Sequence, residues 1–366
     1  MSLDCDQGVE LAPDFARIKN ELTLWAKLKH FPLKVTFELT PLCNFRCPMC
    51  YVHLDAAGMA KQGKLMSAEK WLEIGRQSRD MGALFVTLTG GEPFLHPEFW
   101  TIYNGLTEMG LLVLIFSNGY LIDEEVVEKL KANPPHNIKL SIYGASNETY
   151  ETMCGVKNGF TRVSHAIDLL KEAELPFYCS CTVVHENFKD GLELYRFAAE
   201  KQIKFFHTMA VAQSARGSLA DPLSSRTTTE EENWTLEGLE DLKRKQDLRP
   251  FAFCGGYKTS YFMTWHGHMQ FCGFAPRPSV QIRDTVDVQT AWDQLHEMTD
   301  AIKTPEECAT CEHAEFCMRC PGLLAAESGG YPDRTSKAFC EPAAERHRLY
   351  DELKAKALAE ASDSAD

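Results

Sequence analysis

Apolar residues along the chain follow two patterns. Short runs rich in Val, Ile, Leu and Phe predict strands that are buried on both faces. Between them, longer stretches repeat apolar residues every three or four positions, which predicts amphipathic helices. The predicted strands are Lys34–Leu39, Phe85–Thr89, Leu112–Phe116, Ile138–Ile142, Tyr178–Val184 and Lys204–Val211.

The predicted helices precede and alternate with these strands. They cover residues 13–31, 71–81, 99–109, 124–132, 160–174 and 190–202. Strands that alternate with helices indicate a parallel sheet with right-handed crossovers. Six such units are too few for a closed eight-stranded barrel, so the pattern predicts an α/β fold with a partial (β/α)6 TIM-like barrel.

Polar residues cluster where the predicted strands end. Three cysteines within 43–50 follow the first strand, and Gly90-Gly91-Glu92-Pro93 follows the second. Ser117-Asn118-Gly119 follows the third strand, and Ser141 lies late in the fourth. The C-terminal ends of barrel strands carry the chemistry of barrel enzymes, so these residues are candidate site residues.

Composition and charge narrow the class of protein. The 366 residues are 44% hydrophobic and 25% charged, which is typical of globular domains. No apolar run approaches the ~18 residues of a membrane span, and the acidic start does not resemble a secretory signal. We therefore expect a cytoplasmic protein with no membrane partner. The net charge of −14 also argues against nucleic acid as a partner.

The pattern divides the chain into five predicted segments. They are an N-terminal helical segment (1–32), the barrel (33–215), a helical bridge (216–250), a cysteine-rich domain (251–345), and a C-terminal helix with an acidic tail (346–366). The bridge contains one predicted helix, Glu230–Gln246.

Fourteen cysteines are unusual for a cytoplasmic chain, where disulfides are rare. Ten of them fall into two groups, which favours metal binding. The first group is Cys43, Cys47 and Cys50. The second group is Cys254, Cys272, Cys308, Cys311, Cys317, Cys320 and Cys340. We interpret Cys5, Cys154, Cys179 and Cys181 as ordinary thiols.

The first group offers three thiolates in one short loop. Structural zinc usually takes four N or S ligands, and a [4Fe–4S] cluster usually takes four cysteines. With three cysteines, one iron of a cluster keeps an open position for a small molecule. The alternative is a zinc knuckle completed by His53.

The Cys-x3-Cys-x2-Cys loop is followed by the aromatic Tyr51 and, downstream, by Gly-Gly-Glu-Pro. Over roughly residues 33–215 this arrangement resembles the radical S-adenosylmethionine (SAM) enzymes. The resemblance implies that the open iron binds the amino and carboxylate groups of SAM. It further implies reductive cleavage of SAM, and hydrogen abstraction from a substrate by the 5′-deoxyadenosyl radical. A reducing partner such as flavodoxin or ferredoxin is then expected.

The glycine-rich turn is the next candidate for SAM binding. Gly90 and Gly91 allow the backbone to approach a ligand closely, and Glu92 offers a carboxylate to an ammonium group or braces the loop. A simple turn is the alternative. By resemblance, Ser117, Asn118 and Ser141 would face the methionine or ribose end, and Tyr51 would lie near the adenine. Satisfied polar groups and core packing are the alternatives for these residues.

The second group has two recognisable spacings. Two predicted short strands, Thr259–Trp265 and His268–Cys272, turn at Gly267 and would bring Cys254 near Cys272. Farther along, Cys-x2-Cys-x5-Cys-x2-Cys provides paired cysteines, which strongly indicate a metal site. A four-cysteine zinc site with leftover thiols is the alternative.

This second group resembles the SPASM extension of peptide-modifying radical SAM enzymes, which carries two auxiliary [4Fe–4S] clusters. The resemblance assigns Cys254, Cys272 and Cys320 to the first auxiliary cluster. It assigns Cys308, Cys311, Cys317 and Cys340 to the second. Three [4Fe–4S] clusters are then expected in the chain, with folding coupled to metal binding.

Two features depart from the family pattern. Only Met318 and Arg319 separate the last two cysteines of the Cys-x2-Cys series, where the family usually has three residues. The first auxiliary cluster has three cysteines, so its fourth position is open, water-bound or filled by another residue such as His266 or His268.

The SPASM resemblance implies a peptide or protein substrate, and we favour maturation of a ribosomally made peptide by cross-linking or by oxidation of a Cα or side chain. Sulfatase maturation and tetrapyrrole oxidation are alternatives. Gly273 stands where sulfatase-maturating enzymes carry an aspartate, which disfavours the first of these. About 33 residues precede the first strand, and we expect them to be too few for the N-terminal peptide-recognition domain that many peptide maturases carry. No general base is identified. A non-catalytic zinc or iron–sulfur module remains a further alternative.

Overall fold

The structure is a computed structural model. It describes residues 13–218, 220–228, 231, 242–243, 247, 249–252, 254–282 and 286–363. Cys5 and almost all of the predicted helix Glu230–Gln246 lie outside these residues. The extent of the predicted helical bridge therefore stays a prediction.

One sheet forms the centre of the described structure, with the strand order β6-β5-β4-β3-β2-β1-β7-β8-β9. The strands are β1 (Lys34–Glu38), β2 (Phe85–Thr89), β3 (Leu112–Ser117), β4 (Asn137–Ser141), β5 (Phe177–Thr182), β6 (Phe205–Thr208), β7 (Ser260–Met263), β8 (His268–Gln270) and β9 (Ser279–Gln281). Strands β1 to β6 pair in parallel, each with the next along the chain. The predicted partial barrel is thus confirmed.

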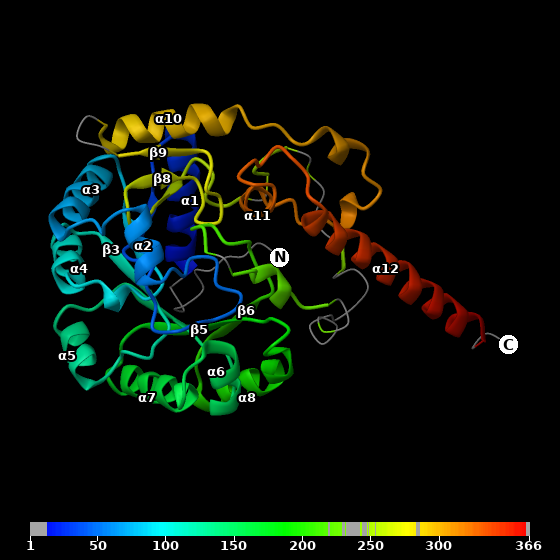
Figure 1. Ribbon diagram of the computed structural model, residues 1–366, viewed down its shortest axis with the longest axis horizontal. Coiled ribbons are helices and arrows are strands. Elements are labelled where there is room, and N and C mark those ends of the chain that lie inside the picture. The colour runs from blue at the N-terminus through cyan, green and yellow to red at the C-terminus, as the bar shows by residue number, and fades with distance from the viewer. Residues whose placement is uncertain are drawn as a thin grey trace.

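Helices α3 (Ala68–Asp80), α4 (Phe99–Glu108), α5 (Glu124–Ala132), α7 (Gly159–Glu172) and α8 (Gly191–Lys201) cover the outer side of the barrel strands (Figure 1). The other helices are α1 (Pro13–Lys29), α2 (Ala56–Gln62), α6 (Asn147–Cys154), α10 (Val288–Asp300), α11 (Pro321–Glu327) and α12 (Lys337–Asp363). Helix α12 projects away from the barrel (Figure 1). Short 3-10 helices are η1 (Pro93–Leu95), η2 (Phe188–Asp190), η3 (Pro222–Ser225), η6 (Glu306–Thr310) and η7 (Ala314–Phe316). None of the described helices is long and apolar enough to cross a membrane.

The differences from the sequence prediction include two helices and one strand end in the barrel. Helix α2 buries none of its residues, so it leaves no apolar stripe for a pattern to detect. Helix α6 is only eight residues long, between its cap Ser146 and the left-handed Gly155. Strand β6 ends at Thr208 rather than Val211, because its partner β5 ends at the paired residue Thr182.

The predicted hairpin forms, and it also extends the barrel sheet. Strands β7 and β8 pair antiparallel, as the turn at Gly267 predicts. Strand β7 also pairs in parallel with β1, along Lys34–Phe37. The cysteine-rich region therefore begins as a continuation of the barrel sheet, and it enters the sheet beside the start of β1, where Ser260 pairs with Lys34.

The core lies between the sheet and the outer helices. Val86, Leu88 and Ile138 are fully buried on the sheet, and Trp71 and Ile74 are fully buried on α3. Helices α3 and α4 pack closely through facing glycines. A methyl group on Gly75 would lie 2.4 Å from Leu106, and one on Gly105 would lie 2.5 Å from Leu72. Tight packing of this kind gives the strand ends a rigid support.

Candidate functional site

The loop of the first cysteine group follows β1 and is fixed from two sides. The Phe45 ring is buried, with its centroid 5.6 Å from that of Tyr120 and 6.2 Å from that of Tyr150. The backbone N–H of Arg46 donates to the carbonyl of Cys154, at the end of α6, over 2.9 Å. The loop is therefore anchored to the core and not only to its own strand.

The three thiols of this loop form one electrostatic group. Burial, followed by the charge of Cys47, raises the pKa of Cys50 to about 11. Burial also raises the pKa of Cys43, and the charges of Cys50 and Cys47 add to it. For Cys47, a hydrogen bond with Cys154 is the main cause of a raised pKa, ahead of burial. Buried thiols of this kind ionise readily only beside a cationic centre, so the donor set fits an iron–sulfur cluster.

The Gly-Gly-Glu-Pro turn is built against this loop. The N–H of Gly91 donates to the Thr40 carbonyl over 2.7 Å, and the N–H of Glu92 donates to the Leu42 carbonyl over 2.9 Å. A Cβ on Gly90 would lie 2.4 Å from the Thr40 oxygen, and one on Gly91 would lie 2.3 Å from the Leu42 oxygen. Both glycines are required because two backbone segments meet here, next to Cys43.

The Glu92 carboxylate joins the ends of β2 and β3. It accepts hydrogen bonds from Ser117 Oγ (3.0 and 3.1 Å), from the Asn118 N–H (2.8 Å) and from the Phe94 N–H (3.3 Å). Burial raises its pKa to about 7, against these hydrogen bonds, which lower it. Asn118 Nδ2 in turn donates to Asn44 Oδ1 over 2.8 Å. Glu92 therefore braces the turn and, through Asn118, the cysteine loop.

Ser141 and Tyr51 border the same region. Ser141 hydrogen-bonds the hydroxyl of Tyr143, whose pKa is raised mainly by burial and then by the charge of Cys47. The Tyr51 ring packs edge-on against Phe274, with centroids 4.6 Å apart. Tyr143 is a neighbour of the thiols that sequence analysis missed, because its position just beyond β4 carries no separate signal.

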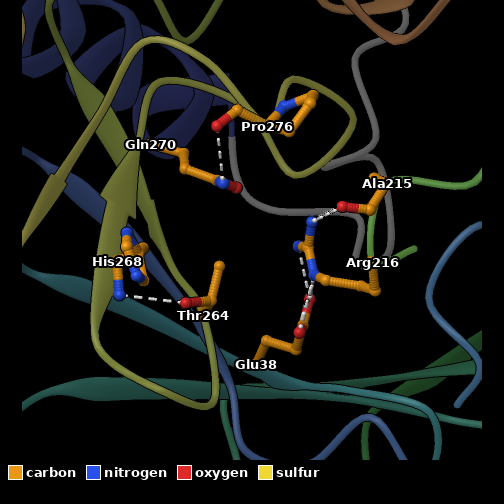
Figure 2. A network of polar contacts seen from close by, with 7 residues as sticks. All are labelled: Glu38, Ala215, Arg216, Thr264, His268, Gln270 and Pro276. Carbon is orange, nitrogen blue, oxygen red and sulfur yellow. Dashed lines mark hydrogen bonds and ion pairs between the residues drawn. The ribbon is translucent and has the colours of Figure 1, made fainter. Parts of the chain in front are cut away.

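A buried ion pair lies at the end of β1 (Figure 2). Glu38 is fully buried, and the Arg216 side chain is 2% exposed. Arg216 Nη2 and Nε donate to the Glu38 carboxylate over 2.6 and 2.9 Å, and Nη1 donates to the Ala215 carbonyl. Sequence analysis missed this pair. An acidic residue inside an apolar strand does indicate a partner, but nothing local identifies a residue so distant in sequence.

The ion pair and a cysteine of each group lie near the hydroxyl of Tyr51. Burial is the main cause that raises the pKa of Tyr51. Arg216, Glu38, Cys272 and Cys50 all act on the same hydroxyl through their charges. Cys50 belongs to the barrel loop and Cys272 to the C-terminal group. Both groups therefore face one interior region, in which Tyr51, Glu38 and Arg216 lie.

Polar side chains of the β7–β8 hairpin border this region (Figure 2). Gln270 Nε2 donates to the Pro276 carbonyl over 3.4 Å, while Gln270 Oε1 is buried without a partner. The rings of His266 and His268 lie 4.7 Å apart. Burial, with the charges of His268 and Arg216, lowers the pKa of His266 to about 4. A role for either histidine as a cluster ligand stays a prediction.

The structure brings Cys254, Cys272 and Cys320 together. Burial raises the pKa of Cys272 to about 12, and the charges of Cys320 and Cys254 contribute. A Cβ on Gly322 would lie 2.8 Å from the Cys272 sulfur and 3.8 Å from the Cys320 sulfur. Gly322 thus leaves room for two thiols at the start of α11.

The other four C-terminal cysteines surround a common space. A cavity of about 50 Å³ is lined by Cys308, Cys311, Cys317 and Cys340, together with Arg319. Thiolates are the ligands that iron–sulfur clusters take, so this donor set also fits a cluster. Within the described residues, no three His, Cys, Asp or Glu side chains converge as they would around a single metal ion.

The three described cysteines outside the two groups are buried in the barrel. Cys179 and Cys181 lie on β5 and belong to the hydrophobic core, as ordinary thiols would. Cys154 is also fully buried, but its hydrogen bond with Cys47 places it beside the first group. Its helix α6 was not predicted, so its position next to the loop could not be anticipated.

Comparison with known proteins agrees with this geometry. Residues 37–198 match the Radical SAM superfamily. The chain is 25% identical over 344 residues to the AdoMet-dependent heme synthase of Methanosarcina barkeri, covering 85% of this chain and 97% of that protein. It is 26% identical over 309 residues to the PqqA peptide cyclase of Granulibacter bethesdensis, covering 78% of this chain and 81% of that protein. Among solved structures, Streptococcus suis SuiB bound to its precursor peptide SuiA has the same fold, with a TM-score of 0.65 and 17% identity, covering 90% of this chain and 82% of SuiB.

Proposed function

Because the chain carries a radical SAM domain at residues 37–198, we propose that it is a SPASM-type enzyme that modifies a peptide. In this proposal it holds three [4Fe–4S] clusters and takes electrons from a flavodoxin or ferredoxin. When bound, the barrel cluster and SAM supply the reductive cleavage that starts hydrogen abstraction from the substrate.

The barrel residues hold and orient the cofactors. Cys43, Cys47 and Cys50 would ligate three irons, and their burial would exclude water from the cluster. The turn at Gly90 and Gly91 would hold SAM beside them. Glu92, Ser117, Asn118 and Ser141 would form the polar wall at the methionine and ribose end, with Tyr51 near the adenine.

Glu92 has a further property that suits this role. Its carboxylate accepts hydrogen bonds from Ser117 and Asn118, and burial raises its pKa to about 7. An ammonium group placed nearby would favour the charged form of the carboxylate. The positive end of SAM would therefore complete the electrostatics of the site.

The C-terminal cysteines would hold the auxiliary clusters. We assign Cys254, Cys272 and Cys320 to the inner cluster. We assign Cys308, Cys311, Cys317 and Cys340 to the outer cluster. The fourth position of the inner cluster would be left for substrate, water or another residue.

One observation supports this function above the others: the ring of Tyr51, which directly follows Cys50, lies 4.6 Å from the ring of Phe274, two residues after Cys272. A substrate in this region would face both the radical source and an auxiliary cluster. The PqqA peptide cyclase, which is similar over 78% of this chain, favours a peptide as that substrate.

A tetrapyrrole is the second candidate substrate, because the similarity to the AdoMet-dependent heme synthase extends over 97% of that protein. Tetrapyrrole substrates carry carboxylates, which require cationic partners. Arg216 is a cation of this region, and the Glu38 carboxylate already neutralises it. The charge of the interior therefore favours a peptide.

The experiment begins with iron, sulfide and zinc per chain in anaerobically prepared protein. We expect about twelve irons and matching sulfide, for three cubes. The loaded enzyme is then incubated with reductant, SAM and synthetic peptides translated from short reading frames beside its gene. We expect 5′-deoxyadenosine together with a mass change of one peptide.

Three results would contradict the proposal in different ways. Stoichiometric zinc with little iron would identify a structural metal protein. About eight irons would remove one auxiliary cluster, in the first place the one with three cysteines. Turnover of an iron–coproporphyrin probe in the same assay, with no peptide changed, would establish the second candidate instead.

A further inference from the structure

Arg319 lies at the junction of the two C-terminal cysteine sets. It follows Cys317 by two residues and directly precedes Cys320. Its φ of 43° is in the left-handed region, which is uncommon for a residue other than glycine. Its backbone N–H donates to the Cys317 thiol. The short two-residue spacing is thus accommodated by a strained turn at Arg319, a conformation that is common at functional sites.

Arg319 lines the cavity of the outer four cysteines. Its Nη1 and Nη2 atoms are both buried, and neither has a hydrogen-bond partner. Buried N–H groups in folded proteins nearly always have an acceptor, so two unpaired ones on one side chain require an explanation. Asp247 lies within electrostatic reach, but Arg249 Nε and its N–H already donate to that carboxylate.

Arg319 lies among the thiols of the same cavity. It lines that cavity together with Cys308, Cys311, Cys317 and Cys340. Its backbone N–H also donates to Cys317, so the residue is held next to sulfur. The cavity that it lines offers four thiols as possible acceptors and places for bound sulfide.

We propose that Arg319 tunes the outer auxiliary cluster: its two Nη donors hydrogen-bond the cluster sulfurs, and its charge raises the reduction potential. This inference rests on the proposed function, because it requires a cluster on these four cysteines. Hydrogen bonds to the sulfurs and the local charge are two of the main determinants of such potentials. A cluster gains negative charge on reduction, so a nearby cation favours the reduced form.

The test is a redox titration of the fully loaded enzyme, followed by electron paramagnetic resonance. For Arg319→Gln we expect the ratio of oxidised to reduced outer cluster, at a fixed applied potential, to rise about tenfold, which is ~59 mV for one electron. Arg319→Lys keeps the charge and should shift less. Arg346→Gln is the matched control, since Arg346 acts on Cys317 through its charge but does not line the cavity.

A second readout covers the case in which Arg319→Gln loses its outer cluster. Pulsed resonance of the reduced outer cluster, in protein labelled with 15N only on the arginine guanidinium groups, should show a 15N coupling, which Arg319→Lys should lack while it keeps the iron. Three loaded clusters with no change in potential and no nitrogen coupling would overturn the role of Arg319 alone. Wild-type protein without iron on these cysteines would instead overturn the proposed function.

Discussion

The two cysteine regions achieve the same kind of donor set in different ways. In the barrel, three thiols come from one loop whose Phe45 side chain is buried in the main core. In the C-terminal region, seven thiols are spread from Cys254 to Cys340, on short 3-10 helices, turns and helix ends. Cys311 and Cys340 are exposed. Packing against the core fixes the position of the barrel loop. The positions of the outer C-terminal thiols depend much more on the metal that they bind.

The hydrophobic contacts explain this difference. Cys43 and Cys47 pack against the large core that joins the sheet to its helices. Cys320 packs against a small separate cluster with Ala212, Leu323 and Ala326. A small core contributes little stability, so metal binding and local folding should be coupled in the C-terminal region and nearly independent in the barrel.

The largest effect is expected from removing one ligand of the barrel loop. Cys47→Ala should abolish SAM cleavage and leave about two-thirds of the iron, since the other two clusters are held elsewhere. The sheet should stay folded, because it does not need the cluster. 5′-Deoxyadenosine formation, iron content and circular dichroism measure these three effects. Cys179→Ala is the control within the barrel, and retained SAM cleavage in Cys47→Ala would refute the assignment.

The matching change in the C-terminal region should behave differently. Cys311→Ala should lose peptide product but keep uncoupled SAM cleavage. Because this region depends on its cluster, hydrogen exchange should accelerate over residues 306–343, while strands β1 to β6 stay protected. Full turnover on the peptide would show that the outer cluster is dispensable. Unchanged exchange would show that the region folds without it.

The same contrast decides what could be predicted from sequence. The barrel strands carry long apolar runs, and their ends place Cys43, Gly91 and Ser117 in one region, so the fold and this side of the site were predictable. The Glu38–Arg216 pair and the hydrogen bond from Cys47 to Cys154 join distant segments, and no local pattern encodes them. The pairing of β7 with β1 was missed for the same reason.

Breaking the buried Glu38–Arg216 ion pair should lower the stability of the barrel whether or not metal is bound. Arg216→Met leaves Glu38 as an unpaired buried carboxylate, which should lower the free energy of unfolding by about 3–5 kcal/mol. The double variant with Glu38→Gln should recover much of this loss. Urea unfolding of metal-free protein measures both. Arg348→Gln breaks an exposed pair and should cost no more than about 1 kcal/mol. If Arg216→Met and Arg348→Gln lowered the free energy of unfolding by the same amount, the buried pair would have no special role in the interior.

The smallest expected effect is a pH dependence of stability that arises on helix α10. It tests whether α10 belongs to the part of the chain that folds without metal. Helix α10 follows the hairpin, but its Trp292 Nε1 donates to the His30 carbonyl beside the barrel. Burial, followed by the charge of Lys258, lowers the pKa of His296 on this helix to about 4 from 6.5. The unfolded chain therefore binds the proton more tightly, and stability should fall as the pH drops from 6.5 towards 4. His296→Phe should weaken this dependence in melting temperatures measured across that range. If α10 folds with the barrel, the melting temperature of Cys311→Ala should depend on pH in the same way as that of the wild type. If Cys311→Ala loses this pH dependence, the metal-independent part of the chain ends at the β7–β8 hairpin instead.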